Sequence, residues 1–175
     1  SEKSGDSSYV PMNTSESFSA LLKLSFNIIN GVRFSLLYSH SDDNWYGYDH
    51  GFKYNPDGRA GSHKVTKYTA FQLNHMISQN FFYEIKLSNV NNDFGTYVFE
   101  NPLDPGYVHD RYFDSYGPGF LTGGQSKDHT TRKMVDQTFK LDATWQLNHH
   151  HSLKSGIHYF GHKLDNQWRS IRNKY

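Results

Sequence analysis

Two groups of side chains are candidates for metal chemistry in this sequence. Residues 149–151 are three consecutive histidines, whereas a zinc ion needs ligands that converge from separated positions, so we interpret them as a solvated turn. His158 and His162, with Asp165, are expected on one face of the last strand. Polar side chains that face water explain this second group without a metal. The sequence therefore predicts no metal site and no cofactor.

The acidic and glycine-rich residues of the second half form no catalytic pattern. The spacing of the acids between residues 91 and 135 does not match the calcium-binding loop of about twelve residues; these acids are Asp93, Glu100, Asp104, Asp110 and Asp114. The glycines of residues 116–124 are not followed by Lys and then Ser or Thr, as a phosphate-binding loop requires, so they predict turns. Because no set of nucleophile, base and acid is present, we predict that the protein is not an enzyme.

Aromatic side chains outside the clearest strands are the best candidates for binding a ligand. Rings with Asp and Asn nearby are suited to hold a sugar, a peptide or a metal chelate. The alternative is that they pack the loops together or lie at the level of lipid headgroups. The candidates are Trp45, Tyr46, Tyr48, Tyr107, Tyr112, Phe113 and Tyr116.

The composition excludes several classes of protein. The chain has 175 residues, which allows one domain or at most two. Its 18 Lys and Arg against 17 Asp and Glu give a net charge of +1, so no charge field indicates a nucleic-acid partner. The absence of cysteine excludes disulfides and thiol catalysis. No run approaches the roughly 18 apolar residues that indicate a membrane-spanning helix.

Apolar residues alternate with a period of two, which predicts strands rather than helices. In residues 137–147, Phe139, Leu141, Ala143, Trp145 and Leu147 share one face. Similar patterns predict six strands, near residues 17–27, 33–41, 67–75, 81–90, 136–147 and 153–163. The connections between them are short at 28–32, 76–80 and 148–152, and long at 42–65 and 91–135. We therefore predict an all-β fold of antiparallel up-and-down hairpins with long loops at one end.

The parity of the apolar positions predicts how the strands pair. In the first hairpin, Phe26 pairs with Phe34, and Ile28 opposite Val32 leaves a three-residue loop that ends at Gly31. The same matching pairs Leu24 with Leu36 and Leu22 with Tyr38. In the last hairpin, pairing Leu147 with Leu153 sets Trp145 against Ser155 and Ala143 against Ile157.

Two environments are compatible with such strands. In a soluble sandwich or barrel the apolar row packs a core, and loop aromatics including Trp45 would bind a carbohydrate. In a membrane barrel the apolar row faces lipid and the polar row lines a watery lumen. Connections as long as the two seen here are uncommon in a compact soluble domain, and aromatic rings cluster near both ends of the strands, as a lipid interface favours. These two features favour the membrane.

Three segments resemble the TonB-dependent outer-membrane receptors, especially the Bacteroidetes-like branch. They are residues 68–88 (YTAFQLNHMISQNFFYEIKLS), 101–108 (NPLDPGYV) and 145–156 (WQLNHHHSLKSG). The resemblance implies a transmembrane β-barrel in the cell outer membrane that takes up a scarce nutrient, such as a metal chelate, an oligosaccharide or a peptide. It also implies the partners: outer-membrane lipid, a plug domain and the TonB complex. Whether a surface lipoprotein covers the barrel stays open.

The number of strands differs from that of the family. These receptors have about 22 strands around a plug, and six strands do not close a barrel, for which about eight is the smallest count. We therefore expect the chain to be an internal part of a longer receptor. On this interpretation, residues 1–15 and 166–175 belong to extracellular loops.

Overall fold

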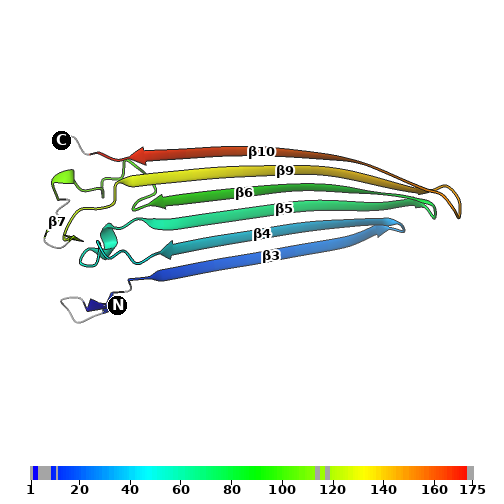
Figure 1. The fold of residues 1–175 in the computed structure, drawn as a ribbon. Coiled ribbons are helices and arrows are strands. Elements are labelled where there is room, and N and C mark those ends of the chain that lie inside the picture. Colours follow the sequence, from blue (N-terminus) through cyan, green and yellow to red (C-terminus); the bar gives the residue numbers. More distant parts are fainter. Residues whose placement is uncertain (1, 4–8, 11, 113–114, 117–118, 173–175) are drawn as a thin grey trace.

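The structure, a computed structural model, is a single antiparallel sheet of six long strands (Figure 1). It describes residues 2–3, 9–10, 12–112, 115–116 and 119–172. The order across the sheet is β10-β9-β6-β5-β4-β3, with every neighbouring pair antiparallel. The six strands are β3 (Thr14–Ile29), β4 (Val32–Tyr46), β5 (Gly61–Ser78), β6 (Phe81–Tyr97), β9 (Asp128–Gln146) and β10 (Ser152–Ser170). The predicted all-β, up-and-down fold is confirmed.

The remaining elements are short and lie at the loop end of the sheet (Figure 1). They are the strands β1 (Glu2–Lys3), β2 (Tyr9–Val10), β7 (Ser115–Tyr116) and β8 (Phe120–Leu121), and the 3-10 turns η1 (Pro56–Gly58) and η2 (Asp110–Tyr112). None of the described elements is a helix of the length and apolarity that crossing a membrane requires.

The strands extend further toward the loop end than the alternation predicted. The β4–β5 and β5–β6 ladders run on to Trp45↔Ser62 and Gly61↔Tyr97, although we expected residues 42–65 and 91–135 to be loops. Backbone hydrogen bonds hold these polar stretches in the sheet. Because such bonds do not depend on the side chains, the strands continue where the apolar alternation ends. The long connections therefore shrink to residues 47–60 and 98–127, and residues 166–170, expected in a loop, belong to β10.

The first hairpin confirms most of its predicted register. Phe26 pairs with Phe34, and the pairs Leu24↔Leu36 and Leu22↔Tyr38 are also present. The pairing of Ile28 with Val32 was wrong, because a bulge between Asn27 and Ile29 lets Ile29 pair with Val32. The turn is therefore Asn30-Gly31. Gly31 has a φ of 84°, and a Cβ on it would lie 2.7 Å from the carbonyl oxygen of Met76, so this position requires glycine.

The last hairpin differs from its predicted register by two residues. Trp145 pairs with Leu153 and Ala143 with Ser155, so the predicted pairing of Leu147 with Leu153 was wrong. The cause is the turn, in which the Leu147 amide donates to the carbonyl of His151 at 3.0 Å. The side chain of Asn148 also accepts hydrogen bonds from the amides of residues 150 and 151, both at 2.9 Å. A shift of two residues leaves every side chain on its predicted face.

The buried side chains gather at the loop end of the molecule rather than along the length of the sheet. Among the described residues they include Met12, Phe52, Arg59, Tyr107 and His129. Arg59 ties this region together by donating to the carbonyls of Met12 at 2.5 Å and Gly47 at 2.8 Å. No second described layer covers either face of the six-stranded sheet (Figure 1). The sheet therefore has two open faces.

Candidate functional site

One face of the sheet carries continuous rows of apolar side chains across all six strands. Because partner residues in a ladder lie on the same face, the pairing gives these rows directly. One row is Phe26, Phe34, Leu73, Ile85, Leu141 and Ile157. The next, one step toward the loop end, is Leu24, Leu36, Phe71, Leu87, Phe139 and Tyr159. We call this face the apolar face.

The apolar face is free of charge over the half of the sheet nearest the short turns. On β9 its residues from Trp145 to Val135 include no Asp, Glu, Lys or Arg. Charge returns at a similar level on every strand, at Glu16, Asp42, Lys67, Asp93, Lys133 and Lys163. The charge-free stretch of β9 is about 33 Å long at roughly 3.3 Å per residue. Strands tilted by about 40° would give it a height of about 25 Å, equal to the apolar band of membrane barrels.

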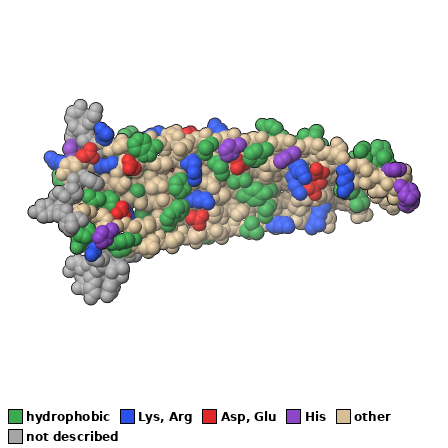
Figure 2. Space-filling view, in the orientation of Figure 1, with side chains coloured by type: hydrophobic (Ala, Val, Ile, Leu, Met, Phe, Trp, Pro, Cys, Tyr) green, Lys and Arg blue, Asp and Glu red, His purple; other side chains and the backbone are tan. Residues whose placement is uncertain are grey.

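The opposite face, which we call the charged face, carries the charges of the same half of the sheet. They are Lys23, Arg33, Glu84, Lys86, Lys140, Asp142 and Lys154. Lys86 pairs with Glu84 at 2.5 Å and Lys140 with Asp142 at 2.7 Å. Side chains of both signs lie near the turn end of the space-filling view (Figure 2). The two faces therefore prefer different surroundings.

The apolar face is uncovered in this chain. Phe26 is 52% exposed and Ile157 62% exposed. Leu22, Leu24, Leu87 and Tyr159 are also exposed. The rows that the alternation predicted are thus present, and they do not pack into a closed interior formed by the described residues.

The candidate ring Tyr107 is buried and fixes a loop. Its hydroxyl accepts a hydrogen bond from the Phe99 amide and donates one to the Phe99 carbonyl, both at 3.2 Å. The two rings meet edge to face with centroids 5.1 Å apart. These contacts correspond to the loop-packing alternative for this residue.

Trp45 and Tyr46 are consecutive in β4 and therefore lie on opposite faces. Trp45 lies on the charged face beside Phe94, with ring centroids 6.0 Å apart. Tyr46 lies at the loop end of the apolar face, 5.9 Å from the ring of His63 and 5.8 Å from the guanidinium carbon of Arg59.

The other candidate rings lie in the loops. Tyr48 and Tyr112 are exposed. Tyr48 shares a 2.6 Å hydrogen bond with His50, and Arg111 donates to the hydroxyl of Tyr112 at 2.9 Å. The backbone of Tyr116 pairs with Phe120 in the β7–β8 hairpin, and Phe113 lies outside the described residues. The described candidate rings therefore make separate local contacts, and whether they bind a ligand stays a prediction.

Three rings that the sequence analysis missed form a stack across β5, β6 and β9. Tyr97 lies between His63 and His129, with centroids 4.8 Å and 5.0 Å away and planes within 18° of parallel. His63 bonds the side chain of Asn44 at 2.6 Å, and His129 bonds the carbonyl of Glu100 at 2.9 Å. Burial lowers the pKa of His63 and raises the pKa of Tyr97. All three have the parity of the apolar residues on their strands, so extending the alternation would have found them.

A pocket of about 310 Å³ lies beside this stack, at the level where charge returns to the apolar face. Lys67, Asp93, Lys133 and Glu100 line it together with His63 and Tyr97. Oppositely charged and aromatic groups in one small pocket are suited to a polar ligand with charges of both signs.

The histidines behave as ordinary polar residues. His158 and His162 lie on the charged face, but Asp165 lies on the other face, so placing all three together was wrong. His162 instead pairs with Asp136. No cluster of metal-ligating side chains occurs among the described residues.

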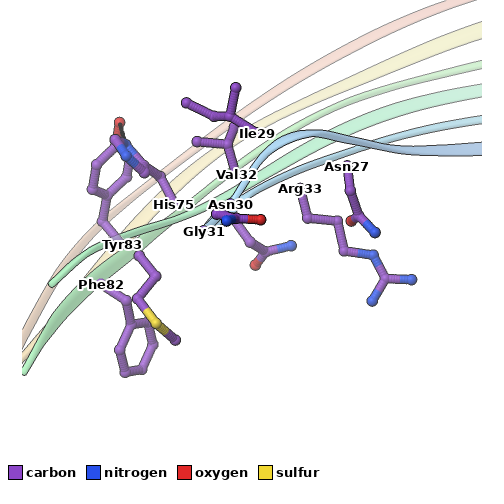
Figure 3. Close-up of a pocket in the computed structure, with 11 residues that line it drawn as sticks. Asn27, Ile29, Asn30, Gly31, Val32, Arg33, His75, Phe82 and Tyr83 are labelled. Carbon is purple, nitrogen blue, oxygen red and sulfur yellow. Dashed lines mark hydrogen bonds between the residues drawn. The ribbon is translucent and has the colours of Figure 1, made fainter. Parts of the chain in front are cut away.

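A second hollow of about 460 Å³ surrounds the Asn30-Gly31 turn (Figure 3). Ile29 and Val32 point to one side of it, and Asn27 and Arg33 to the other (Figure 3). Because the side chains diverge to the two faces of the sheet, we interpret this hollow as the flank of a turn rather than a binding site.

Comparisons of the chain with protein-family models, with curated proteins and with solved structures found no match.

Proposed function

We propose that this chain is a length of wall, with extracellular loops, from a TonB-dependent receptor barrel that takes up a scarce nutrient through the outer membrane. The observation that carries the membrane part is the charge-free, exposed half of the apolar face, opposite a charged face. The assignment to this receptor family is supported by the resemblance of the three sequence segments described above.

The apolar face is large enough that its burial against lipid or protein would contribute substantially to stability. Full burial of one large apolar side chain stabilises a protein by about 1.5–3 kcal/mol. The twelve residues of the two apolar rows that contain Phe26 and Leu24 are partly exposed. Burying them would stabilise the folded protein by on the order of 10 kcal/mol. That is comparable to the whole net stability of a typical domain, about 5–15 kcal/mol. A single-layer sheet in water would forgo this contribution.

The position of the charges favours lipid over a second sheet as the cover. In a sandwich, the inner face stays apolar along the length of the packed strands. Here charge returns on all six strands before they reach the loop end, within three successive rows of the apolar face. A band of limited height is what a bilayer imposes. The strands, of 15–19 residues, are also long enough to cross an apolar core and continue beyond it.

The lengths of the connections and the two edge strands of the sheet are consistent with a wall segment of an outer-membrane barrel. Short turns lie at one end of the sheet and connections 47–60 and 98–127 at the other, as in outer-membrane barrels with long external loops. The outermost strands β3 and β10 each have only one partner in the sheet. Because unpaired backbone groups are costly in lipid, the proposal requires further strands against both edges. The charged face then lines the lumen, where water surrounds its ion pairs.

The membrane part is tested by the need for a bilayer or detergent. The receptor that contains this chain is purified in detergent, added to vesicles and separated by flotation, and its strand content is measured by circular dichroism with and without lipid. We expect folded protein to float with the vesicles and to aggregate without them. A monomeric, cooperatively folded protein in plain buffer would overturn the proposal.

The receptor part is tested separately by ligand binding. Deleting residues 104–125 from the second long connection leaves β6 and β9 intact. We expect this variant to insert normally but to lose binding of the transported nutrient. The matched control deletes residues 149–150 from the turn at the other end, which leaves β9 and β10 intact. Unchanged nutrient binding in the loop variant would contradict the role of these loops.

A further inference from the structure

A pocket of about 560 Å³ lies where both long connections meet the loop ends of β9 and β10. Its lining includes Phe52, Asp110, Gln125, Asp128, Ser170 and Arg172. Asp128 and Ser170 are direct partners and lie on the charged face. If that face lines the lumen, as proposed above, the pocket lies at the outer end of the lumen wall, where a ligand reaches it from the external medium. The pocket beside the stack of His63 and Tyr97 lies on the apolar face, so a nutrient that enters the lumen does not meet it.

Hydrogen bonds hold the walls of this pocket in place before a ligand binds. The Gln125 side chain donates to the Gly106 carbonyl at 3.0 Å and accepts from the Val108 amide at 2.9 Å. The Ile171 amide donates to the Lys127 carbonyl at 2.9 Å, which joins the residue after β10 to the residue before β9. Because these groups are already ordered, binding costs little further conformational entropy.

Among the described residues, two opposite charges of the pocket have no ion-pair partner. The Lys127 side chain is only 14% exposed and forms an ion pair with Asp110 at 3.6 Å. Asp128 and Arg172 are exposed, and neither belongs to an ion pair within 4.0 Å in the described part of the chain. One carboxylate and one guanidinium are therefore accessible to a ligand that carries both charges.

These groups match a short peptide better than the other two nutrient classes considered for the receptor. At pH 7 a peptide with free ends carries an ammonium at one end and a carboxylate at the other. Its side chains suit the apolar surface that Phe52 and Ile171 contribute to the pocket. A neutral oligosaccharide leaves both Asp128 and Arg172 without a counter-charge, and an anionic metal chelate places negative charge beside Asp128.

We propose that this pocket binds a short peptide with free ends as the transported nutrient. Asp128 accepts hydrogen bonds from the terminal ammonium, and Arg172 donates two parallel hydrogen bonds to the terminal carboxylate. The ion pair of Lys127 with Asp110 is part of the wall between the second long connection and β9. The inference rests on the proposed receptor function and names the substrate class of that receptor.

The experiment measures peptide binding by the receptor that contains this chain, purified in detergent, with isothermal titration calorimetry. The probe is trialanine with both ends free. N-acetyl-trialanine lacks the terminal ammonium and trialanine amide lacks the terminal carboxylate, so each derivative removes one of the two proposed contacts. Maltotriose and ferric citrate represent the other two nutrient classes.

Three variants assign the contacts to particular residues. Asp128→Asn and Arg172→Gln each remove one charge from the pocket. Arg169→Gln is the matched control, because Arg169 is an exposed arginine of β10 that does not line the pocket.

We expect trialanine to bind about tenfold more tightly than either derivative, because hydrogen bonds between charged groups are stronger than neutral ones. Maltotriose and ferric citrate should bind more weakly than trialanine. Asp128→Asn should weaken trialanine binding about tenfold and leave the binding of N-acetyl-trialanine unchanged. Arg172→Gln should weaken trialanine binding by a similar factor and leave the binding of trialanine amide unchanged, while Arg169→Gln changes neither.

Equal affinity for trialanine and both derivatives would overturn the inference, as would tighter binding of maltotriose or ferric citrate. Equal losses in Arg172→Gln and Arg169→Gln would also overturn it. The flotation and loop-deletion experiments above test the proposed function separately. A receptor that enters vesicles, and that loses binding of another nutrient when residues 104–125 are deleted, refutes only the peptide site.

Discussion

Placing a charge at Leu73 tests the orientation of the sheet. Leu73 lies on the apolar face between Phe34 and Ile85, near the middle of the charge-free band. A Lys or Arg at the bilayer midplane on the lipid face of a barrel destabilises it by about 2–4 kcal/mol. Leu73→Lys should therefore lower the ratio of folded to unfolded protein by roughly 30- to 700-fold, at about 1.4 kcal/mol per factor of ten.

The neighbouring residue provides a matched control. Asn74 follows Leu73 on the same strand but lies on the charged face, between Arg33 and Glu84. Asn74→Lys adds the same charge at nearly the same depth, beside one cation and one anion. We expect its stability to change by less than about 1 kcal/mol, as for other exposed charge pairs.

The assay is equilibrium unfolding by guanidinium in lipid vesicles, followed by tryptophan fluorescence. The account predicts a large loss of stability for Leu73→Lys and a small change for Asn74→Lys. The reverse order would place the charged face in the apolar environment and refute the proposed orientation. Equal small effects would show that neither face contacts lipid.

Three further perturbations test local features. Gly31→Ala puts a Cβ 2.7 Å from the Met76 carbonyl oxygen at a φ of 84° and should destabilise the protein by about 1–3 kcal/mol, as measured by thermal melting. The control is Gly47→Ala, where no atom lies within 4 Å of the added Cβ. An equal loss of stability in the two variants would contradict this prediction. Tyr107→Phe removes two hydrogen bonds from a buried hydroxyl, should cost about 1 kcal/mol and should speed proteolysis of residues 98–127; unchanged cleavage would refute this role. Burial lowers the pKa of His63 in the folded protein. The protein should therefore keep its full stability above the unfolded pKa of about 6.5 and lose stability as the pH falls from there toward the folded pKa. Titration by nuclear magnetic resonance measures the folded pKa, and a value above the unfolded one would contradict this prediction.

The sequence was sufficient to predict the fold class and the faces. Alternation around Phe139 and Leu141 identified the apolar face. The assignment is well determined, because a shift of one residue would move every apolar side chain of the strand to the opposite face. The register of Phe26 with Phe34 followed from the same parity. The last register was wrong because Asn148 accepts hydrogen bonds from the amides of residues 150 and 151, and the turn lies at residues 147–151 instead of 148–152.

The loop ends of the strands could not be predicted from apolar alternation. The stretches 61–66, 91–97 and 128–135 are rich in polar residues, and backbone pairing with both neighbours keeps them in the sheet. The stack of His63, Tyr97 and His129 lies in these stretches and was missed with them. Trp45 and Tyr46 were grouped as one candidate site, whereas the continued strand separates them onto two faces.

Accessibility of alternate residues on β9 tests the central claim most directly. The protein has no cysteine, so single cysteines at residues 139–144 can each carry a spin label. In lipid vesicles, the account predicts that labels at 139, 141 and 143 collide mainly with dissolved oxygen, which concentrates in acyl chains. Labels at 140, 142 and 144 should collide mainly with a water-soluble nickel complex. A pattern in which 139, 141 and 143 are shielded from both reagents would place the apolar face against protein and contradict the account.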